Sequence, residues 1–127
     1  AFAAPPDRIG SPTWAKSLAE AIVSVIVKDP ESALSYGIWH CACQGSMSRY
    51  ELAKEIERIM IQSGKTPVST DPALFGETCI REVVSSAFEE KAMRPSNSSL
   101  DSHAFCSAFS IRLPSIQEAL VQYMQTL

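Results

Sequence analysis

Residues 37–60 read Gly-Ile-Trp-His-Cys-Ala-Cys-Gln-Gly-Ser-Met-Ser-Arg-Tyr-Glu-Leu-Ala-Lys-Glu-Ile-Glu-Arg-Ile-Met, and they set the fold class. Residues 38–43 are apolar on both faces, which is typical of a strand buried from both sides in a mostly parallel sheet. Ser48 and Glu51 then form a capping box, which predicts the start of a helix. One face of that helix is apolar at helical spacing: Leu52, Ile56, Ile59 and Met60. A buried strand followed by a helix indicates an α/β protein.

Two more helices are predicted on either side of this region. Thr13, preceded by Pro12, is a candidate N-cap for a helix that runs to about Lys28. Pro30 ends that helix, because proline disfavours helical geometry in the residue before it. Ser115-Ile116-Gln117-Glu118 is a second capping box, and it opens a helix near the end of the chain. The first of these helices carries one apolar stripe: Leu18, Ala21, Ile22, Val25 and Ile26.

The remaining segments give shorter signals. Gly64 follows the Ser48 helix where a C′ residue belongs. Residues 67–69 and 80–85 are strand candidates, and Asp71-Pro72 between them predicts a small helix or a surface loop. Asp101 is expected to cap a short helix that buries Phe105 and Phe109.

Composition bounds the function. The chain has 127 residues, 46% of them hydrophobic, which is enough for one ordinary domain with a core. Its net charge of −3 and the absence of a basic run argue against a nucleic-acid partner. The longest apolar run, residues 21–27, is too short to span a membrane. No charged-then-apolar leader opens the chain, and four cysteines are too few for a disulfide scaffold, so we expect a cytoplasmic protein.

Several stretches together resemble a known family. They are residues 7–19, residues 36–40 with 48–53, and residues 94–101 with 113–120. In this order and spacing they resemble the C-terminal part of dTDP-4-dehydrorhamnose reductase, an extended short-chain dehydrogenase/reductase. The sequence departs from the usual pattern at Arg8, Ser17, Arg49 and Ile116, and residues 66–79 resemble an insertion. These departures bear on substrate identity more than on the fold.

The resemblance implies a fold and a set of partners. Residues 1–127 are expected to form a single incomplete domain, comprising the edge of a Rossmann sheet and a small helical substrate-binding lobe. The N-terminal NAD(P)-binding half is expected to be absent, because the chain lacks the glycine-rich turn of a dinucleotide site. The start at Ala1 suggests that the chain was processed or is a piece of something longer. The complete enzyme would reduce a dTDP-4-keto sugar with NADPH or NADH. The expected partners are a nucleotide-sugar, and either the missing half or a second copy of the chain.

The resemblance also implies site residues, each with a structural alternative. Gly10, Ser11, Pro12 and Thr13 would lie near the sugar-nucleotide pocket, or would simply turn the chain and cap a helix. Arg94 would contact the substrate diphosphate, or would hold its own loop through a carbonyl or carboxylate. Asn97 carries the same two interpretations. Asp101 does too, although as a helix cap it needs no ligand.

No catalytic or cofactor-binding residue is predicted in this chain. A dinucleotide site needs clustered glycines, and the five glycines here are scattered. Tyr50 and Lys54 have the Tyr-x-x-x-Lys spacing of a short-chain dehydrogenase, but they fall in the capping-box segment, which the family uses structurally. The spacing of His40, Cys41 and Cys43 does not suit a metal, and residues 99–103 lack a nucleophile elbow.

Three functions therefore compete. The chain is the substrate-binding part of a dTDP-4-dehydrorhamnose reductase-like oxidoreductase, inactive alone. Alternatively it is a non-catalytic binding or regulatory module, like the methionine adenosyltransferase regulatory subunit of the same family. The third possibility is an α/β remnant without a ligand, whose stability would be indifferent to any dTDP-sugar.

Overall fold

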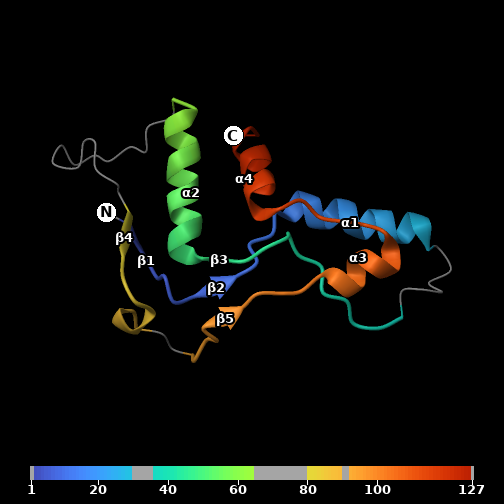
Figure 1. The fold of residues 1–127 in the computed structure, drawn as a ribbon, viewed down its shortest axis with the longest axis horizontal. Helices are drawn as coiled ribbons and strands as arrows, with labels where there is room; N and C mark the ends of the chain where they lie inside the picture. The colour runs from blue at the N-terminus through green and yellow to red at the C-terminus, as the bar shows by residue number, and fades with distance from the viewer. Residues whose placement is uncertain (1, 30–35, 65–79, 90–91, 127) are drawn as a thin grey trace. The chain divides into compact units, whose positions relative to one another are not determined.

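The computed structural model of the chain describes residues 2–29, 36–64, 80–89 and 92–126 (Figure 1). These residues form two compact units, and each is built from separate stretches of the chain. The first unit comprises Ala1–Gly10 and Met47–Ser98, and the second comprises Ser11–Ser46 and Ser99–Leu127. The α/β class predicted from the sequence is confirmed, with short strands and α-helices both present.

The first unit contains two small sheets and one long helix. Strand β1 (Phe2–Ala4) pairs in parallel with β4 (Ile80–Glu82). Strand β2 (Ile9–Gly10) lies between β3 (Met47–Ser48), to which it is antiparallel, and β5 (Asn97–Ser98), to which it is parallel.

Helix α2 (Arg49–Gln62) packs against β1, β3 and β4 of the same unit. The buried apolar side chains of this unit include Ala4, Met47 and Ile59. A 3-10 turn, η2 (Ser85–Ala87), follows β4. The predicted strand at residues 80–85 is thus correct only for its first half.

The second unit is helical. It consists of α1 (Ala15–Lys28), α3 (His103–Phe109) and α4 (Ile116–Met124), with an isolated bridge between Gln44 and Ser115. Its core includes Phe105 and Phe109, whose burial on a short helix was predicted. Their ring centroids lie 5.1 Å apart. The other buried apolar side chains of this unit are Ala21, Ala42, Cys43, Leu113, Ile116 and Ala119.

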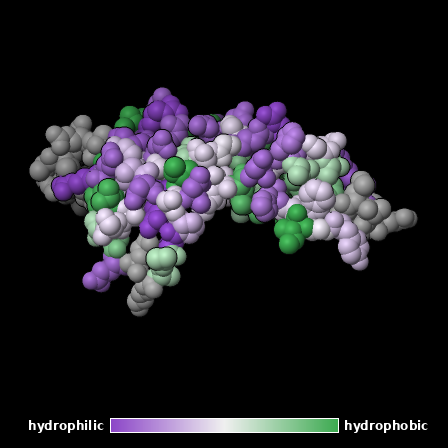
Figure 2. All heavy atoms as spheres, turned by 60° about the horizontal axis from the view of Figure 1, so that its bottom comes forward, coloured by the Kyte–Doolittle hydropathy of each residue, from purple (hydrophilic) through white to green (hydrophobic). Residues whose placement is uncertain are grey.

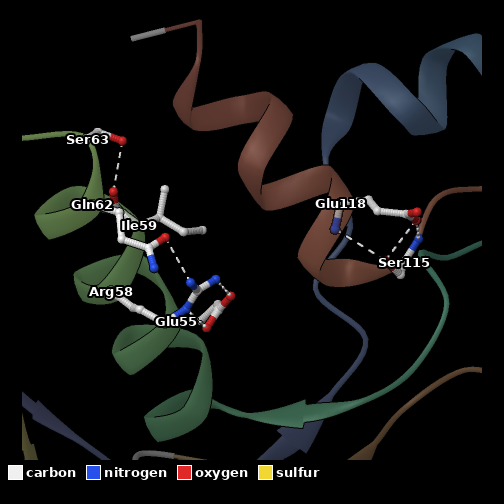
Figure 3. A network of polar contacts seen from close by, with 7 residues as sticks. All are labelled: Glu55, Arg58, Ile59, Gln62, Ser63, Ser115 and Glu118. Atoms are coloured by element: carbon white, nitrogen blue, oxygen red, sulfur yellow. Dashed lines mark hydrogen bonds and ion pairs between the residues drawn. The ribbon is translucent and has the colours of Figure 1, made fainter.

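Both predicted capping boxes are present. The Ser48 N–H donates to Glu51 Oε2 at 2.7 Å, and the Glu51 N–H donates to Ser48 Oγ at 3.1 Å. In α4 the Ser115 N–H donates to Glu118 Oε2 at 2.8 Å, and the Glu118 N–H donates back to Ser115 Oγ at 3.2 Å (Figure 3). The bonds that each serine donates, from its backbone N–H first and then its side chain, lower the pKa of the glutamate carboxyl group because they stabilise the ionised form.

The ends of α2 agree with the sequence signals. Gly64 has a φ of +70°, the left-handed conformation expected of a C′ glycine. Farther back along the helix, Arg58 donates to Glu55 at 2.8 Å and to Gln62 at 2.9 Å, which links three successive turns on one face (Figure 3). The helix therefore has local support at both ends and along its polar side.

Two local expectations are wrong. Residues 38–43 form no strand, and Ile38 is 93% exposed. The backbone N–H groups of Ala42 and Cys43 are instead bound by the hydroxyls of Ser102 and Thr13. The N-cap of α1 is Trp14 rather than Thr13, and the Thr13 hydroxyl accepts the Cys43 N–H.

Asp101 lies one position before the N-cap of α3, which is Ser102. Its carboxylate nevertheless accepts the His103 N–H at 2.8 Å, so it satisfies a free donor of the helix start, which was the expected role. The predictions for residues 67–69, for Asp71-Pro72 and for the insertion at 66–79 fall outside the described residues.

Helix α1 exposes much of its apolar stripe. Ala21 is buried, whereas Ile22 is 51% and Ile26 is 62% exposed. Figure 2 shows apolar residues reaching the surface among polar ones. The expectation that this chain by itself leaves apolar surface uncovered is met on α1. Val23 and Val27 extend the same apolar surface, with exposed fractions of 58% and 73%.

We predict that Ser48→Ala lowers the free energy of unfolding by about 1 kcal/mol, because the first turn of α2 loses its hydroxyl acceptor. Urea denaturation followed by circular dichroism measures the change. Ser86→Ala, at an exposed position of η2, is the matched control and should leave the urea midpoint where it is. Equal midpoints for wild type and Ser48→Ala would show that the capping box contributes nothing to stability.

Candidate functional site

The six predicted site residues are divided between the two units. Gly10, Arg94 and Asn97 belong to the first unit, and Ser11, Pro12 and Thr13 belong to the second. Each group is therefore described within its own unit.

In the first unit, Gly10 lies against β5. Parallel pairing sets Ile9 opposite Asn97 and Gly10 opposite Ser98. The Ser98 hydroxyl donates to the Ile9 carbonyl at 3.2 Å, and a Cβ at position 10 would lie 3.3 Å from that hydroxyl oxygen. Gly10 thus permits a close approach of the two strands that any side chain would disturb.

The loop that carries Arg94 is held by Arg8. The Arg8 guanidinium donates to the Arg94 carbonyl at 2.9 Å, and the Arg8 carbonyl accepts the Arg49 N–H at 3.1 Å. The Arg94 side chain is exposed and makes no hydrogen bond or ion pair with the described residues. Of the two roles considered for Arg94, the structural one, holding the loop, is carried out by the side chain of Arg8 and not by that of Arg94.

Asp7 fastens the start of the same segment to η2. Its carboxylate accepts the Ser85 N–H at 2.9 Å and the Ser85 hydroxyl at 2.7 Å. These two bonds, the hydroxyl first, lower the pKa of Asp7 because they stabilise the ionised form. Ser85 is buried, so its two donors depend on this carboxylate.

In the second unit, the Ser11 and Thr13 hydroxyls connect three separate chain segments. Ser11 Oγ donates to the Gly45 carbonyl at 3.0 Å and accepts the Leu100 N–H at 3.1 Å. Thr13 Oγ1 donates to the Ser11 carbonyl at 2.9 Å and accepts the Cys43 N–H at 3.1 Å. Both hydroxyls are committed to structure, so a ligand at this loop would meet backbone and Pro12 rather than free hydroxyl groups.

Two hollows open on the second unit. The first has a volume of about 510 Å³ and the second about 590 Å³, and Gln44 and Arg112 line both. The remaining lining of the first is Cys43, Gly45, Leu100, Asp101, Ser102, His103, Cys106 and Ser107. The remaining lining of the second is Ser17, Glu20, Leu113, Pro114, Glu118 and Gln122.

Sequence reasoning did not find Gln44 and Arg112. Gln44 follows the predicted strand and Arg112 precedes a Leu-Pro pair, and neither position carries a motif. Their side chains meet across 68 residues of sequence, a contact that no local pattern announces.

The residues set aside from catalysis have structural surroundings. The Lys54 ammonium lies 2.8 Å from the carboxylate of buried Glu57, and Tyr50 is half-buried. Burial raises the pKa of the Cys41 thiol, and the nearby Cys106 and Cys43 add to the effect. Within the described ranges, no group of His, Cys, Asp and Glu side chains has the arrangement of a metal site.

The RmlD substrate-binding domain model matches residues 3–127. The chain belongs to this family. The two units, with their short sheets and helices, thus form an RmlD substrate-binding domain. In the described part of this RmlD domain, no helix has the length and apolar character needed to cross a membrane.

Relatives of this RmlD domain are longer proteins. The spore coat polysaccharide biosynthesis protein SpsK of Bacillus subtilis is 35% identical over 94% of this chain and 35% of its own length. The dTDP-4-dehydrorhamnose reductase of Burkholderia thailandensis is 29% identical over 85% of this chain and 36% of its own length. The chain thus spans about a third of the length of these relatives.

A solved structure shows the same fold. The dTDP-4-dehydrorhamnose reductase of Bacillus anthracis in complex with NADP covers 99% of this RmlD domain with a TM-score of 0.76, at 23% identity. Only 38% of the reductase chain is matched. This confirms the expected fold, a portion of a dTDP-4-dehydrorhamnose reductase.

We predict that the stability gained from Asp7 depends on pH. Since the folded pKa of Asp7 lies below its ordinary value of 3.8, the contribution is complete above that value and is lost as the pH falls through the folded pKa. Urea midpoints of wild type and Asp7→Asn, measured between neutral and strongly acidic pH, should differ most at neutral pH and converge on acidification.

Ser85→Ala provides the control in a double-mutant cycle. Once Ser85→Ala is present, adding Asp7→Asn should change the midpoint by less than it does in the wild-type chain. Full additivity of the two substitutions at neutral pH would mean that the Asp7–Ser85 contact does not carry the effect.

Proposed function

We propose that this RmlD domain is the substrate-binding part of an oxidoreductase that reduces the 4-keto group of a dTDP-sugar. The match of the RmlD substrate-binding domain model over residues 3–127 carries the proposal. The Burkholderia reductase, with 29% identity over 112 residues, supports the same substrate class. The NADP complex of the Bacillus anthracis enzyme favours NADPH over NADH as the reductant of the complete protein.

Arg94 is the residue we propose for the substrate diphosphate. Its side chain is exposed, and the Arg8 guanidinium holds its backbone by donating to the Arg94 carbonyl at 2.9 Å. An arginine whose backbone is fixed and whose guanidinium is exposed can present its planar fork to a pair of phosphate oxygens. Asn97, on strand β5 three residues further on, would add an amide beside it.

We propose a role in shape for the first predicted loop. Gly10 allows the backbone to run close to β5, and the Ser11 and Thr13 hydroxyls hold the turn through backbone bonds. Pro12 stiffens the same turn. These residues would border the ligand through backbone and small side chains rather than through charge.

The reducing cofactor is proposed to belong to another part of the protein. The glycines of this chain are at positions 10, 37, 45, 64 and 76, and none forms the clustered turn on which a pyrophosphate rests. The exposed apolar residues of α1, Ile22 and Ile26 among them, are a surface that an NAD(P)-binding half could cover. Relatives about three times as long have room for such a half.

We predict that the chain binds a stable dTDP-sugar and that Arg94→Gln weakens this binding about tenfold or more, since one charge-assisted contact to the diphosphate is lost. Isothermal titration calorimetry with dTDP-glucose measures the affinity. Arg81→Gln removes the same charge at an exposed position of β4 and should leave the affinity within a factor of two. Absence of any saturable binding would refute the proposal for this chain.

We also predict that the chain does not turn over. When it is mixed with NADPH and a dTDP-4-keto sugar, absorbance at 340 nm should fall no faster than without protein, because no bound cofactor can deliver the hydride. The Burkholderia thailandensis reductase is the positive control. Protein-dependent oxidation of NADPH would contradict the assignment of the chain as a binding part only.

A further inference from the structure

The first hollow of the second unit has the dimensions of a small-molecule site. Its volume of about 510 Å³ falls within the range of roughly 300–1,000 Å³ typical of ligand pockets. None of the six residues predicted from sequence lines it. Leu100 and Asp101, which end the motif segment 94–101, do line it.

Gln44 is held rigidly at the edge of this hollow. Its backbone N–H donates to the Pro114 carbonyl at 3.0 Å, and its carbonyl accepts the Ile116 N–H at 3.1 Å. Its side-chain Nε2 donates to the Leu113 carbonyl at 2.7 Å. Because that bond fixes the orientation of the amide, Oε1 faces away from Leu113 and is available as an acceptor.

Arg112 donates to that acceptor. A guanidinium N–H of Arg112 binds Gln44 Oε1, which completes a relay from the Leu113 carbonyl to the arginine. An exposed arginine normally samples many rotamers, and this relay restricts it. Gln44 takes one of the five N–H donors, and Arg112 forms no ion pair with a carboxylate of the described residues. Glu118 lies close enough for the charge of Arg112 to help lower its pKa, but its Oε2 accepts the Ser115 N–H and hydroxyl.

The rest of the lining includes polar residues and one carboxylate. Ser107 and exposed His103 line the hollow, and so does Ser102, whose hydroxyl already donates to the Ala42 carbonyl at 3.4 Å. Asp101 is the acidic member, and its Oδ1 is occupied by the His103 N–H at 2.8 Å. The second hollow is more acidic, because two carboxylates, Glu20 and Glu118, line it beside the same arginine and repel an anion more strongly than the single carboxylate of Asp101 in the first.

We propose that the first hollow binds the oxyanion of a phosphate-bearing ligand, with Arg112 as the binding residue and Gln44 as its positioning residue. Arginine matches phosphate geometry through two parallel N–H bonds, and a guanidinium already oriented loses less entropy on binding. The volume exceeds that of one phosphate group, so the hollow suits a phosphorylated sugar or nucleotide. This site does not depend on the proposed reductase-like function.

Inorganic pyrophosphate is the probe, titrated into the chain by isothermal calorimetry at low ionic strength. Saturable binding is expected, weakened about tenfold or more by Arg112→Gln. Arg112→Lys should recover only part of the loss, because lysine cannot bind two oxygens in parallel. Lys16→Gln removes an exposed charge from the same unit and should leave the affinity within a factor of two.

Gln44→Leu tests the relay. It keeps the charge of Arg112 and should still weaken pyrophosphate binding several-fold. The reason is that an arginine without the Gln44 bond is less ordered before binding and loses more entropy when it binds. Circular dichroism identifies any variant that fails to fold. The proposal is overturned if pyrophosphate gives no saturable heat at millimolar concentration, or if Arg112→Gln binds it as well as wild type does. Neither result depends on whether a dTDP-sugar binds.

Discussion

The shortness of its strands is the constraint on which the described part of this structure depends. There the strands are two or three residues long, so most of the described backbone between the helices has no ladder in which to place its N–H and C=O groups. Side chains provide hydrogen-bond partners for these backbone groups instead. Ser11, Thr13 and Ser102 bind backbone groups from distant parts of the second unit. A buried polar group left unpaired costs about 1–3 kcal/mol, so each of these short side chains carries a disproportionate share of the fold.

The same arrangement leaves charged groups available in two places. In the first unit, Arg8 holds the loop and the adjacent Arg94 is exposed. In the second, the Gln44 side chain donates to the Leu113 carbonyl, and its Oε1 accepts an N–H of Arg112. In each case one residue provides the hydrogen bonds that the fold needs, and a neighbouring guanidinium is left at the surface. Arg8 was noted in the sequence only as a departure from a family pattern, and its bond to the Arg94 carbonyl gives that departure a structural role.

The features predicted from sequence are the ones whose causes are local. A capping box spans four residues, so Ser48 with Glu51 and Ser115 with Glu118 could be identified without knowing the rest of the fold. The failure at residues 38–43 has the opposite cause. An apolar run becomes a strand only if another strand pairs with it, and here its donors are met by hydroxyls.

The candidate site residues came from the family resemblance, and their roles stay predictions. Gly10, Arg94 and Asn97 share the first unit, and the β2–β5 pairing places Gly10 and Asn97 on neighbouring strands. Thr13 was misjudged as a helix cap because its true partner, Cys43, lies 30 residues away. The contact between Gln44 and Arg112 has no signature in composition, spacing or motif, since it joins two ordinary polar residues through the fold alone.

Each unit is built from two separate stretches of the chain, and this affects both gene recombination and folding. The chain passes from one unit to the other after residues 10, 46 and 98, so neither unit is a continuous segment. Neither could be moved to another gene by a single splice, nor released by one proteolytic cut. Each must also wait for distant parts of the chain to arrive before its core can close, which raises the entropic cost of the first native contacts. Recombination therefore has to transfer this region whole, in agreement with a single family model that extends across residues 3–127.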